Sequence, residues 1–255
     1  MRLRSVRCLS WKGCSNGSVD IEASLALMTD ICVRSTVSRI DTPVKSFRNI
    51  PMKKVAPQKN RASRETWIDA AYTAFVNDGI EAVKIMPLAK TLNLTRTGFY
   101  WHFKDLSDLH DAIIDIWRTR NTGIIIERCA TPAQSLCAAL FYLIDCWIDN
   151  DLFDAPLDLA IRNWARNDAR LQTLVAQSDD LRLSAVKALF ARFGKTGDAA
   201  HYRALTVILI QTGYYSMHVS EPRLQRAIAG CQYVEIFAGA PPSPSEKDAF
   251  LDRHR

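Results

Sequence analysis

The chain is poor in the residues that interrupt regular structure, with 10 Gly and 10 Pro among 255 residues. Apolar residues instead recur every three or four positions over long stretches, which is typical of amphipathic helices. This favours an all-α chain, and a hydrophobic content of 48% is sufficient for a sizeable core. No stretch reaches the roughly 18–20 consecutive apolar residues of a membrane span, so we expect a soluble, cytoplasmic protein without a membrane partner.

Cysteine pairs with the spacing of a metal site are also missing. The seven cysteines contain no C-x-x-C pair, and no histidine lies at ligand spacing from two of them. We therefore predict reduced thiols, no metal and no cofactor. A redox-sensing role for Cys137 or Cys146 stays open as an alternative, and it requires a lowered thiol pKa.

The sequence lacks the common signatures of catalysis. It has no phosphate-binding glycine loop, no nucleophile elbow and no His and carboxylate motif at metal spacing. Its histidines are scattered along the chain. The prediction is that the protein is not an enzyme, with a helical enzyme as a rival class.

Positive charge is concentrated at the N-terminus, because residues 1–63 contain 12 Lys and Arg but only 4 Asp and Glu. Residues 1–60 lack sustained periodicity and are predicted to be a basic, disordered extension. Such an arm would attract phosphates without reading sequence. Alternatively, translation begins at Met52, or at Met28, and the upstream residues are an artefact of start-site assignment.

A first helix is predicted over residues 64–77, where Ile68, Ala71, Tyr72 and Phe75 form an apolar stripe and Gly79 supplies the stop. A second, short helix follows from Pro87. Its turn lies at Asn93 and Leu94, since Asn tolerates the left-handed backbone that ends a helix. Thr95 then caps a third helix.

The third helix combines an apolar back with polar residues on its outer side, as a helix that reads the major groove of DNA must. Arg96 and Thr97 are candidates for base contacts. Tyr100, His102 and Lys104 suit phosphate oxygens, which set the register. Trp101 either joins this outer surface or packs between helices. The complete predicted DNA-binding set is Arg64, Thr66, Thr95, Arg96, Thr97, Tyr100, Trp101, His102 and Lys104.

Residues 64–121 resemble the DNA-binding domain of the tetracycline-repressor (TetR) family of transcription regulators. The resemblance rests on RETWIDAAYTAFVNDGIEAVKI, on the helix-turn-helix and above all on FYWHFK at residues 99–104. In that family the first-helix residues and the Tyr, His and first Lys of this run contact the DNA backbone. A second Lys usually follows the first by two residues, and Leu106 stands there in this chain.

The remaining residues predict a bundle of five helices, over residues 131–148, 155–166, 168–193, 198–219 and 222–237. The domains expected are the extension (1–60), the helix-turn-helix domain (61–121), a ligand-binding and dimerisation domain (122–238) and a disordered tail (239–255). Asn167 is the predicted cap of the third bundle helix. A fourth helix of the reader is predicted over residues 105–121.

The resemblance implies that this second domain binds a small effector between its helices and pairs two subunits. The candidates for the pocket wall are Trp117, Phe141, Trp147, Trp164 and Tyr214, although aromatic residues at helical spacing are also ordinary core residues. The last two long helices would form the dimer contact. The residues expected there are Val207, Ile208, Ile210, Gln211, Tyr214, Tyr215 and Met217 of the first of these helices and Ile228, Tyr233, Ile236 and Phe237 of the second. A two-fold dimer matches a palindromic operator with half-sites about 34–36 Å apart.

These features predict a homodimeric repressor that binds duplex DNA and is released by a small effector of unknown identity. Two alternatives stay open, an activator and a degenerate family member that acts through protein interaction. The second is favoured by Leu106, because that residue removes a cation from the segment that carries the resemblance.

Overall fold

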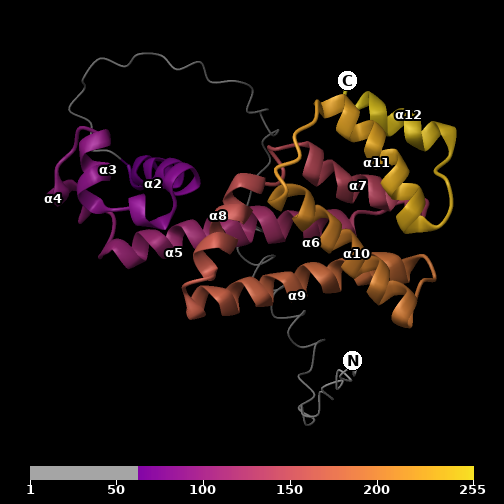
Figure 1. Ribbon diagram of the computed structural model, residues 1–255, viewed down its shortest axis with the longest axis horizontal. Helices are drawn as coiled ribbons and strands as arrows, with labels where there is room; N and C mark the ends of the chain where they lie inside the picture. Colours follow the sequence, from indigo (N-terminus) through magenta and orange to yellow (C-terminus); the bar gives the residue numbers. More distant parts are fainter. Residues whose placement is uncertain (1–62) are drawn as a thin grey trace, which may run out of the picture. The chain divides into compact units, whose positions relative to one another are not determined.

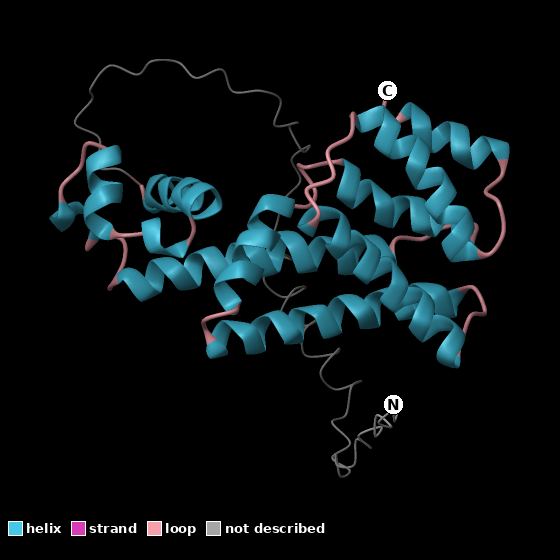
Figure 2. Ribbon diagram, viewed as in Figure 1, coloured by secondary structure: helices cyan, strands magenta, loops and turns pink. Residues whose placement is uncertain are grey.

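The computed structural model describes residues 63–255, and within them it contains helices and loops but no strand (Figures 1 and 2). The predicted all-α fold is therefore confirmed for this part of the chain. The predicted extension over residues 1–60 and the hypothesis of a start at Met52 lie outside the described residues. No helix within residues 63–255 combines the length and apolar character needed to cross a membrane.

The reader consists of α2 (Arg64–Asp78), the short 3-10 turn η1 (Ile80–Ala82), α3 (Ile85–Thr91) and α4 (Arg96–Phe99), followed by α5 (Leu106–Trp117). Gly79 ends α2 with a φ of 82°, as the sequence predicts. The second helix begins two residues before the predicted Pro87. Pro87 occupies the first turn, where its missing N–H leaves no helical hydrogen bond unmade.

Trp67 forms the centre of the reader core, and the sequence analysis missed it. Its indole is fully buried and meets the Phe99 ring edge-on, with centroids 5.3 Å apart. Phe99 in turn stacks on Phe103 at 5.2 Å. The predicted stripe is right for Ile68, Ala71 and Phe75, whereas the Tyr72 hydroxyl reaches out of the core to a carboxylate.

α5 continues without a break into α6 (Ile124–Ala130) through one π-helical segment, η2 (Arg118–Gly123). Figure 1 shows the three as one rod that leads from the reader into the bundle. The predicted end of this helix near Asn121 is wrong. Asn121 is fully buried and its side chain bonds to the backbone at Asp154, so the π segment is held by tertiary contacts. Such segments often mark functional positions in helices.

The bundle contains α7 (Leu136–Ile148), α8 (Ala155–Ala165), α9 (Ala169–Arg192), α10 (Gly197–Ser216) and α11 (Arg223–Ala238). α7 starts later than predicted because the Ser135 hydroxyl caps it by accepting from the Ala138 N–H. Likewise Asp168, and not the predicted Asn167, caps α9.

Residues 239–255 are not the disordered tail that the sequence predicts. Residues Pro244–Asp252 form α12, which starts with a capping box between Ser243 and Glu246. The Phe250 ring is fully buried and stacks on Phe141, with centroids 4.3 Å apart. The Pro and Ser residues of this stretch suggested disorder, but local composition does not reveal a docking surface supplied by α7 and α11.

Two hydrophobic cores result. One fills the bundle around α7, and the other fills the reader. The reader core also includes residues from the bundle helices α8 and α9, namely Leu157, Ile161, Ala165 and Leu171. The domain boundary near residue 121 stays a prediction, but the packing shows that a core is shared across that position.

Candidate functional site

The turn between α3 and α4 has the geometry that the sequence predicts. Asn93 adopts a φ of 55°, and the Leu94 N–H bonds back to the Ala89 carbonyl at 2.8 Å. The Thr95 hydroxyl accepts from the Gly98 N–H at 3.1 Å and so caps α4. This turn holds α4 across α3 with the Phe99 ring inward.

The polar residues of α4 and of the loop after it form an exposed surface above this aromatic core. Arg96, Thr97 and Lys104 are exposed, Tyr100 is 46% exposed and His102 is half-buried. Trp101 is 77% exposed, so the alternative that it packs between helices is wrong. The predicted contacts of this segment are therefore all at least partly accessible to a partner.

Two arginines on this surface are held by aromatic rings. The Arg96 guanidinium donates to the Tyr100 hydroxyl at 3.2 Å and lies 5.7 Å from the centre of that ring. The Arg64 guanidinium lies 4.8 Å from the centre of the Phe103 ring. Both arginines thus extend from defined positions, which lowers the entropy lost when they bind a partner.

The start of α5 explains the unusual Leu106. Asp105 caps the helix by accepting from the Asp108 N–H at 3.0 Å, and Leu106 packs half-buried against the reader core. Thr66, the other predicted contact from α2, is half-buried and bonds to Ser63. The position of Leu106 therefore supports the hydrophobic core and presents no cation.

A buried charge network joins α5, α8 and α9, and the sequence analysis did not predict it. The Asp158 carboxylate accepts from the Trp117 indole at 2.7 Å, from Arg182 at 2.8 Å and from Arg162 at 2.8 Å. Arg162 also makes a two-pronged pair with Asp179. Burial by itself raises the pKa of Asp158, but the two guanidinium groups outweigh it and hold this pKa at about 2.

A second polar cluster ties the reader to the beginning of α8. The Asp154 carboxylate accepts from the Tyr72 hydroxyl of α2 at 2.8 Å and lies 3.3 Å from the Arg120 guanidinium. The other carboxylate oxygen caps α8 by accepting from the Leu157 N–H. The reader and the bundle are thus connected by directional bonds in addition to apolar packing.

The predicted pocket residues do not form one site. Trp117 donates to Asp158 and is fully buried, and Phe141 is a core residue that stacks on Phe250. Trp164 lies at a separate cavity beside His110 of α5. Helical spacing predicts that these aromatic residues lie on the inner faces of their helices. It does not predict which cavity, if any, each of them lines.

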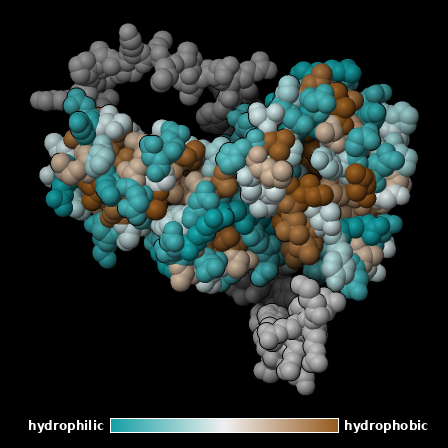
Figure 3. Space-filling view, viewed as in Figure 1, coloured by the Kyte–Doolittle hydropathy of each residue, from teal (hydrophilic) through white to brown (hydrophobic). Residues whose placement is uncertain are grey.

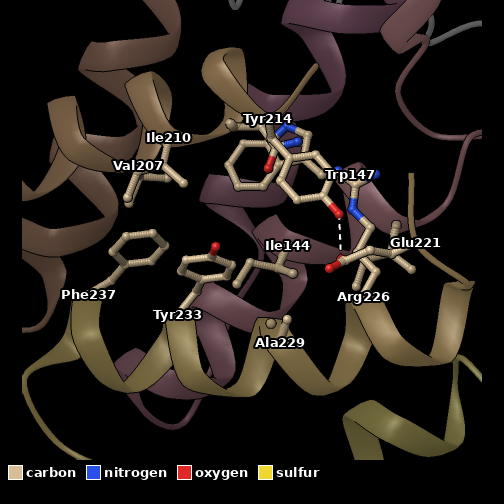
Figure 4. A pocket seen from close by; sticks show the side chains of 13 residues that line it. Ile144, Trp147, Val207, Ile210, Tyr214, Glu221, Arg226, Ala229, Tyr233 and Phe237 are labelled. Atoms are coloured by element: carbon tan, nitrogen blue, oxygen red, sulfur yellow. Dashed lines mark hydrogen bonds between the residues drawn. The ribbon is translucent and has the colours of Figure 1, made fainter. Parts of the chain in front are cut away.

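Trp147 and Tyr214, in contrast, line a common cavity between α7, α10 and α11 (Figure 4). The space inside it is about 60 Å³, and the empty volume rises to about 530 Å³ when the open solvent at its mouth is included. Apolar and aromatic side chains line most of it, together with Gln211, Glu221 and Arg226. A mostly apolar cavity with a few polar groups is the usual form of a small-molecule site.

The four described cysteines give no support to a redox site. Burial raises the pKa of Cys129 to about 12, and it also raises the pKa of Cys137, Cys146 and Cys231. A redox-sensing thiol needs the opposite shift, so that alternative is wrong for Cys137 and Cys146. Within residues 63–255, no group of three or more His, Cys, Asp or Glu side chains could hold a metal ion.

α10 and α11 carry large apolar side chains that their own subunit leaves exposed. Figure 3 shows hydrophobic residues gathered over the part of the bundle where Figure 1 places α10. We call these residues the exposed apolar stripe, and they are Tyr202, Leu209 and Met217 of α10 with Leu224, Ile228 and Ile236 of α11. Val207 and Phe237, which were also expected at a subunit contact, are buried inside the bundle. Apolar patches of this kind mark interaction surfaces.

Comparison with known proteins gives two kinds of similarity. The HTH-type transcriptional regulator AcrR of Shigella flexneri is 32% identical over 73 residues, which are 29% of this chain and 33% of that protein. The match therefore spans about a third of this relative's length. No family model matches the sequence.

Solved structures resemble the chain over a longer stretch. A TetR-family transcriptional regulator from Rhodococcus sp. superposes with a TM-score of 0.54 at 16% identity, covering 69% of this chain and 98% of that one. AmtR of Mycobacterium smegmatis superposes with a TM-score of 0.52 at 17% identity, covering 77% and 95%. At these identities the likeness establishes the fold, and the expected TetR-type architecture is confirmed.

Proposed function

We propose that this chain, a TetR-family protein by its fold, is a homodimeric transcriptional repressor that binds a palindromic operator and is released by a small effector. The observation that carries the DNA-binding part is the exposed surface of α4 above the buried Phe99 ring. A helix presented in this way enters the major groove, while neighbouring residues contact phosphates. Arg96 and Thr97 read bases, and Tyr100, His102 and Lys104 hold the backbone.

We expect Arg96→Ala to weaken binding to the preferred duplex by about 1–3 kcal/mol, because an arginine can donate two hydrogen bonds to a guanine. Fluorescence anisotropy at fixed salt, with a duplex selected from a random pool, measures this loss. Lys187→Ala is the matched control, since Lys187 is an exposed cation on α9, outside the reader. Equal affinities of wild type and Arg96→Ala would contradict the role in reading bases.

The exposed apolar stripe supports the homodimer. It runs along the two helices that form the subunit contact in the resembled family, and a second copy would remove these side chains from water. A two-fold axis through this contact would present two α4 helices to two half-sites. The stripe shares Met217, Ile228 and Ile236 with the predicted face. Tyr202, Leu209 and Leu224 were not predicted, and the other predicted residues are buried or only partly exposed.

We expect Leu209→Glu to convert the dimer into a monomer, because a carboxylate cannot be buried there without a partner. Sedimentation velocity over a range of concentrations measures the change in mass. Ala188→Glu adds the same charge at an exposed position of α9 and should leave the dimer intact. A monomeric wild-type protein would overturn the dimer part of the proposal.

Effector release requires that a ligand favours one of two arrangements of reader and bundle. The bonds from Tyr72 to Asp154 and from Trp117 to Asp158 run between the reader helices and α8. A shift of α8 would therefore be transmitted to α2 and α5. We propose these two bonds as the mechanical connection.

A second candidate function is a protein-interaction module without DNA binding, which Leu106 favours. The two functions are separated by a gel shift at low salt with genomic DNA from the gene's own promoter region. A shift supports the regulator. Its absence, with a folded and dimeric protein, supports the module.

A further inference from the structure

The cavity between α7, α10 and α11 contains an arginine, Arg226, that makes no ion pair with a carboxylate of residues 63–255. The Arg226 guanidinium lies 4.2 Å from the centre of the Tyr214 ring and 5.3 Å from that of Tyr215 (Figure 4 shows Arg226 beside Tyr214). Its Nη2 atom is buried and has no hydrogen-bond partner among the described residues. Because a guanidinium has donors only, an acceptor is what this end of the cavity lacks.

Glu221 lines the same cavity but does not supply that acceptor. It is an exposed residue, and its carboxylate accepts from the Tyr214 hydroxyl at 2.5 Å. The Nε2 atom of Gln211 is a second buried donor without a partner in the described part of the chain. Two donors thus lie in one cavity with the Tyr215 hydroxyl close to both, and the Glu221 carboxylate is engaged by Tyr214.

The tyrosines around Arg226 do not neutralise it. Burial, together with the bond from its hydroxyl to Glu221, raises the pKa of Tyr214 to about 12. Burial raises the pKa of Tyr215 to about 12 as well, even though the charge of Arg226 and hydrogen bonding from Arg226 and Gln211 act in the opposite direction. Both phenols therefore stay protonated near neutral pH and offer Arg226 no negative charge.

The rest of the cavity suits an apolar body. Trp147, Tyr233 and Phe237 provide aromatic walls, and Ile144 and Ile210 provide aliphatic ones (Figure 4). A ligand that fits both parts combines an apolar or aromatic body with an anionic head that has two acceptor oxygens. An Arg and a carboxylate match in this way through paired hydrogen bonds.

We propose that this cavity binds a small organic carboxylate, with its apolar body among the aromatic walls and its carboxylate on Arg226 and Gln211. The inference rests on the proposed function, because it names the chemical class of the effector. Since Nη2 of Arg226 is shielded from solvent, wall side chains shift when the ligand enters.

A second copy of the chain is the other conceivable occupant. Leu209 of the exposed apolar stripe lies on the opposite side of α10 from Val207, but Met217 lies on the same side as the cavity residues Ile210 and Tyr214, so the stripe borders the cavity. A second copy seated by its stripe would place apolar side chains, and no carboxylate, against Arg226. A carboxylate ligand therefore matches the buried donors better.

The test is calorimetric titration of the full chain, without DNA, using matched probes: phenylacetate, 4-phenylbutyrate and octanoate, each beside its uncharged amide. We expect at least one acid to bind about tenfold or more tightly than its amide. Arg226→Met should abolish that preference. Arg223→Met is the matched control, because Arg223 lies on the same helix, is exposed and pairs with Asp149 outside the cavity.

Acids and amides that bind equally, or a complete lack of binding to folded wild type, would overturn the inference. If Arg226→Met does not fold by circular dichroism, the comparison of acid with amide on the wild type decides alone. A change in the monomer–dimer equilibrium of Arg226→Met without probe binding would assign the cavity to a subunit contact, which also overturns it. An acid that binds without changing operator affinity refutes its role as effector and leaves the ligand class standing.

Discussion

Replacement of Asp158 by Asn lowers the free energy of unfolding by about 3–5 kcal/mol, because it removes one of the two carboxylates that balance Arg162 and Arg182 and leaves Asp179 to balance both. Arg182 is 3% exposed and Asp158 is 5% exposed, so water cannot take over the role of the lost carboxylate. The amide of Asn can still accept from the Trp117 indole. Because Asn has nearly the same shape as Asp, the stability lost in this variant measures the contribution of the charge.

Urea denaturation followed by circular dichroism measures this change. For a protein of this size the melting temperature should fall by roughly 2–4 °C for each kcal/mol lost. Asp252→Asn is the control, since Asp252 pairs with Arg255 on the surface and such pairs contribute little. Similar stabilities of Asp158→Asn and Asp252→Asn would show that the network is not stabilising.

The same carboxylate gives the stability a defined pH dependence. Its pKa is about 2 in the folded protein and near the ordinary aspartate value of 3.8 in the unfolded chain. A lowered pKa contributes stability above the unfolded value, and this contribution disappears as the pH falls through the folded one. The stability difference between wild type and Asp158→Asn should therefore narrow between about pH 4 and pH 2.

Phe250→Ala should cost about 3–5 kcal/mol of unfolding free energy, because it leaves a cavity beside Phe141 in the bundle core. Phe250 is fully buried, and a Cβ at Gly230 would approach its ring to 3.4 Å, so α11 and α12 are closely packed here. This residue lies in the stretch that the sequence alone predicts to be disordered. An unchanged stability would favour that sequence-based view over the helix α12.

Polar contacts at both ends of α12 support the same result. The Ser135 hydroxyl donates to Glu246, and Nε2 of His254 lies 2.8 Å from the buried Asp145 carboxylate. Asp248→Ala is the matched control, because Asp248 is exposed on the same helix. It should change the stability by less than about 0.5 kcal/mol.

The sequence predicts the reader well because local rules decide its structure. The positive φ at Asn93, the cap at Thr95 and the stop at Gly79 each depend on the conformational preference of one residue. In FYWHFK, Phe99 and Phe103 are one helical turn apart and buried, and the residues between them are exposed or half-buried. Burial of Trp67 escaped prediction because it depends on the direction from which α4 approaches α2.

Contacts between residues far apart in the sequence could not be predicted from these local preferences. Helical periodicity places Trp117, Phe141 and Trp164 on inner faces, but each meets a different neighbour, and only Trp147 and Tyr214 share a cavity. Asp158 and Arg182 are ordinary charged residues of amphipathic helices until α8 and α9 bring them together. In the same way, α12 depends on a surface built from α7 and α11.

The amino-acid sequence by itself thus determined the all-α class, the helix-turn-helix and its outward polar residues, since backbone preferences and helical periodicity are local properties. The tertiary structure alone decided the buried charge network, the docked C-terminal helix and the position of Arg226 in its cavity. Each of these three features depends on which side chains are shielded from water by neighbouring helices. The packing of the helices decides this, and no single stretch of the chain specifies that packing.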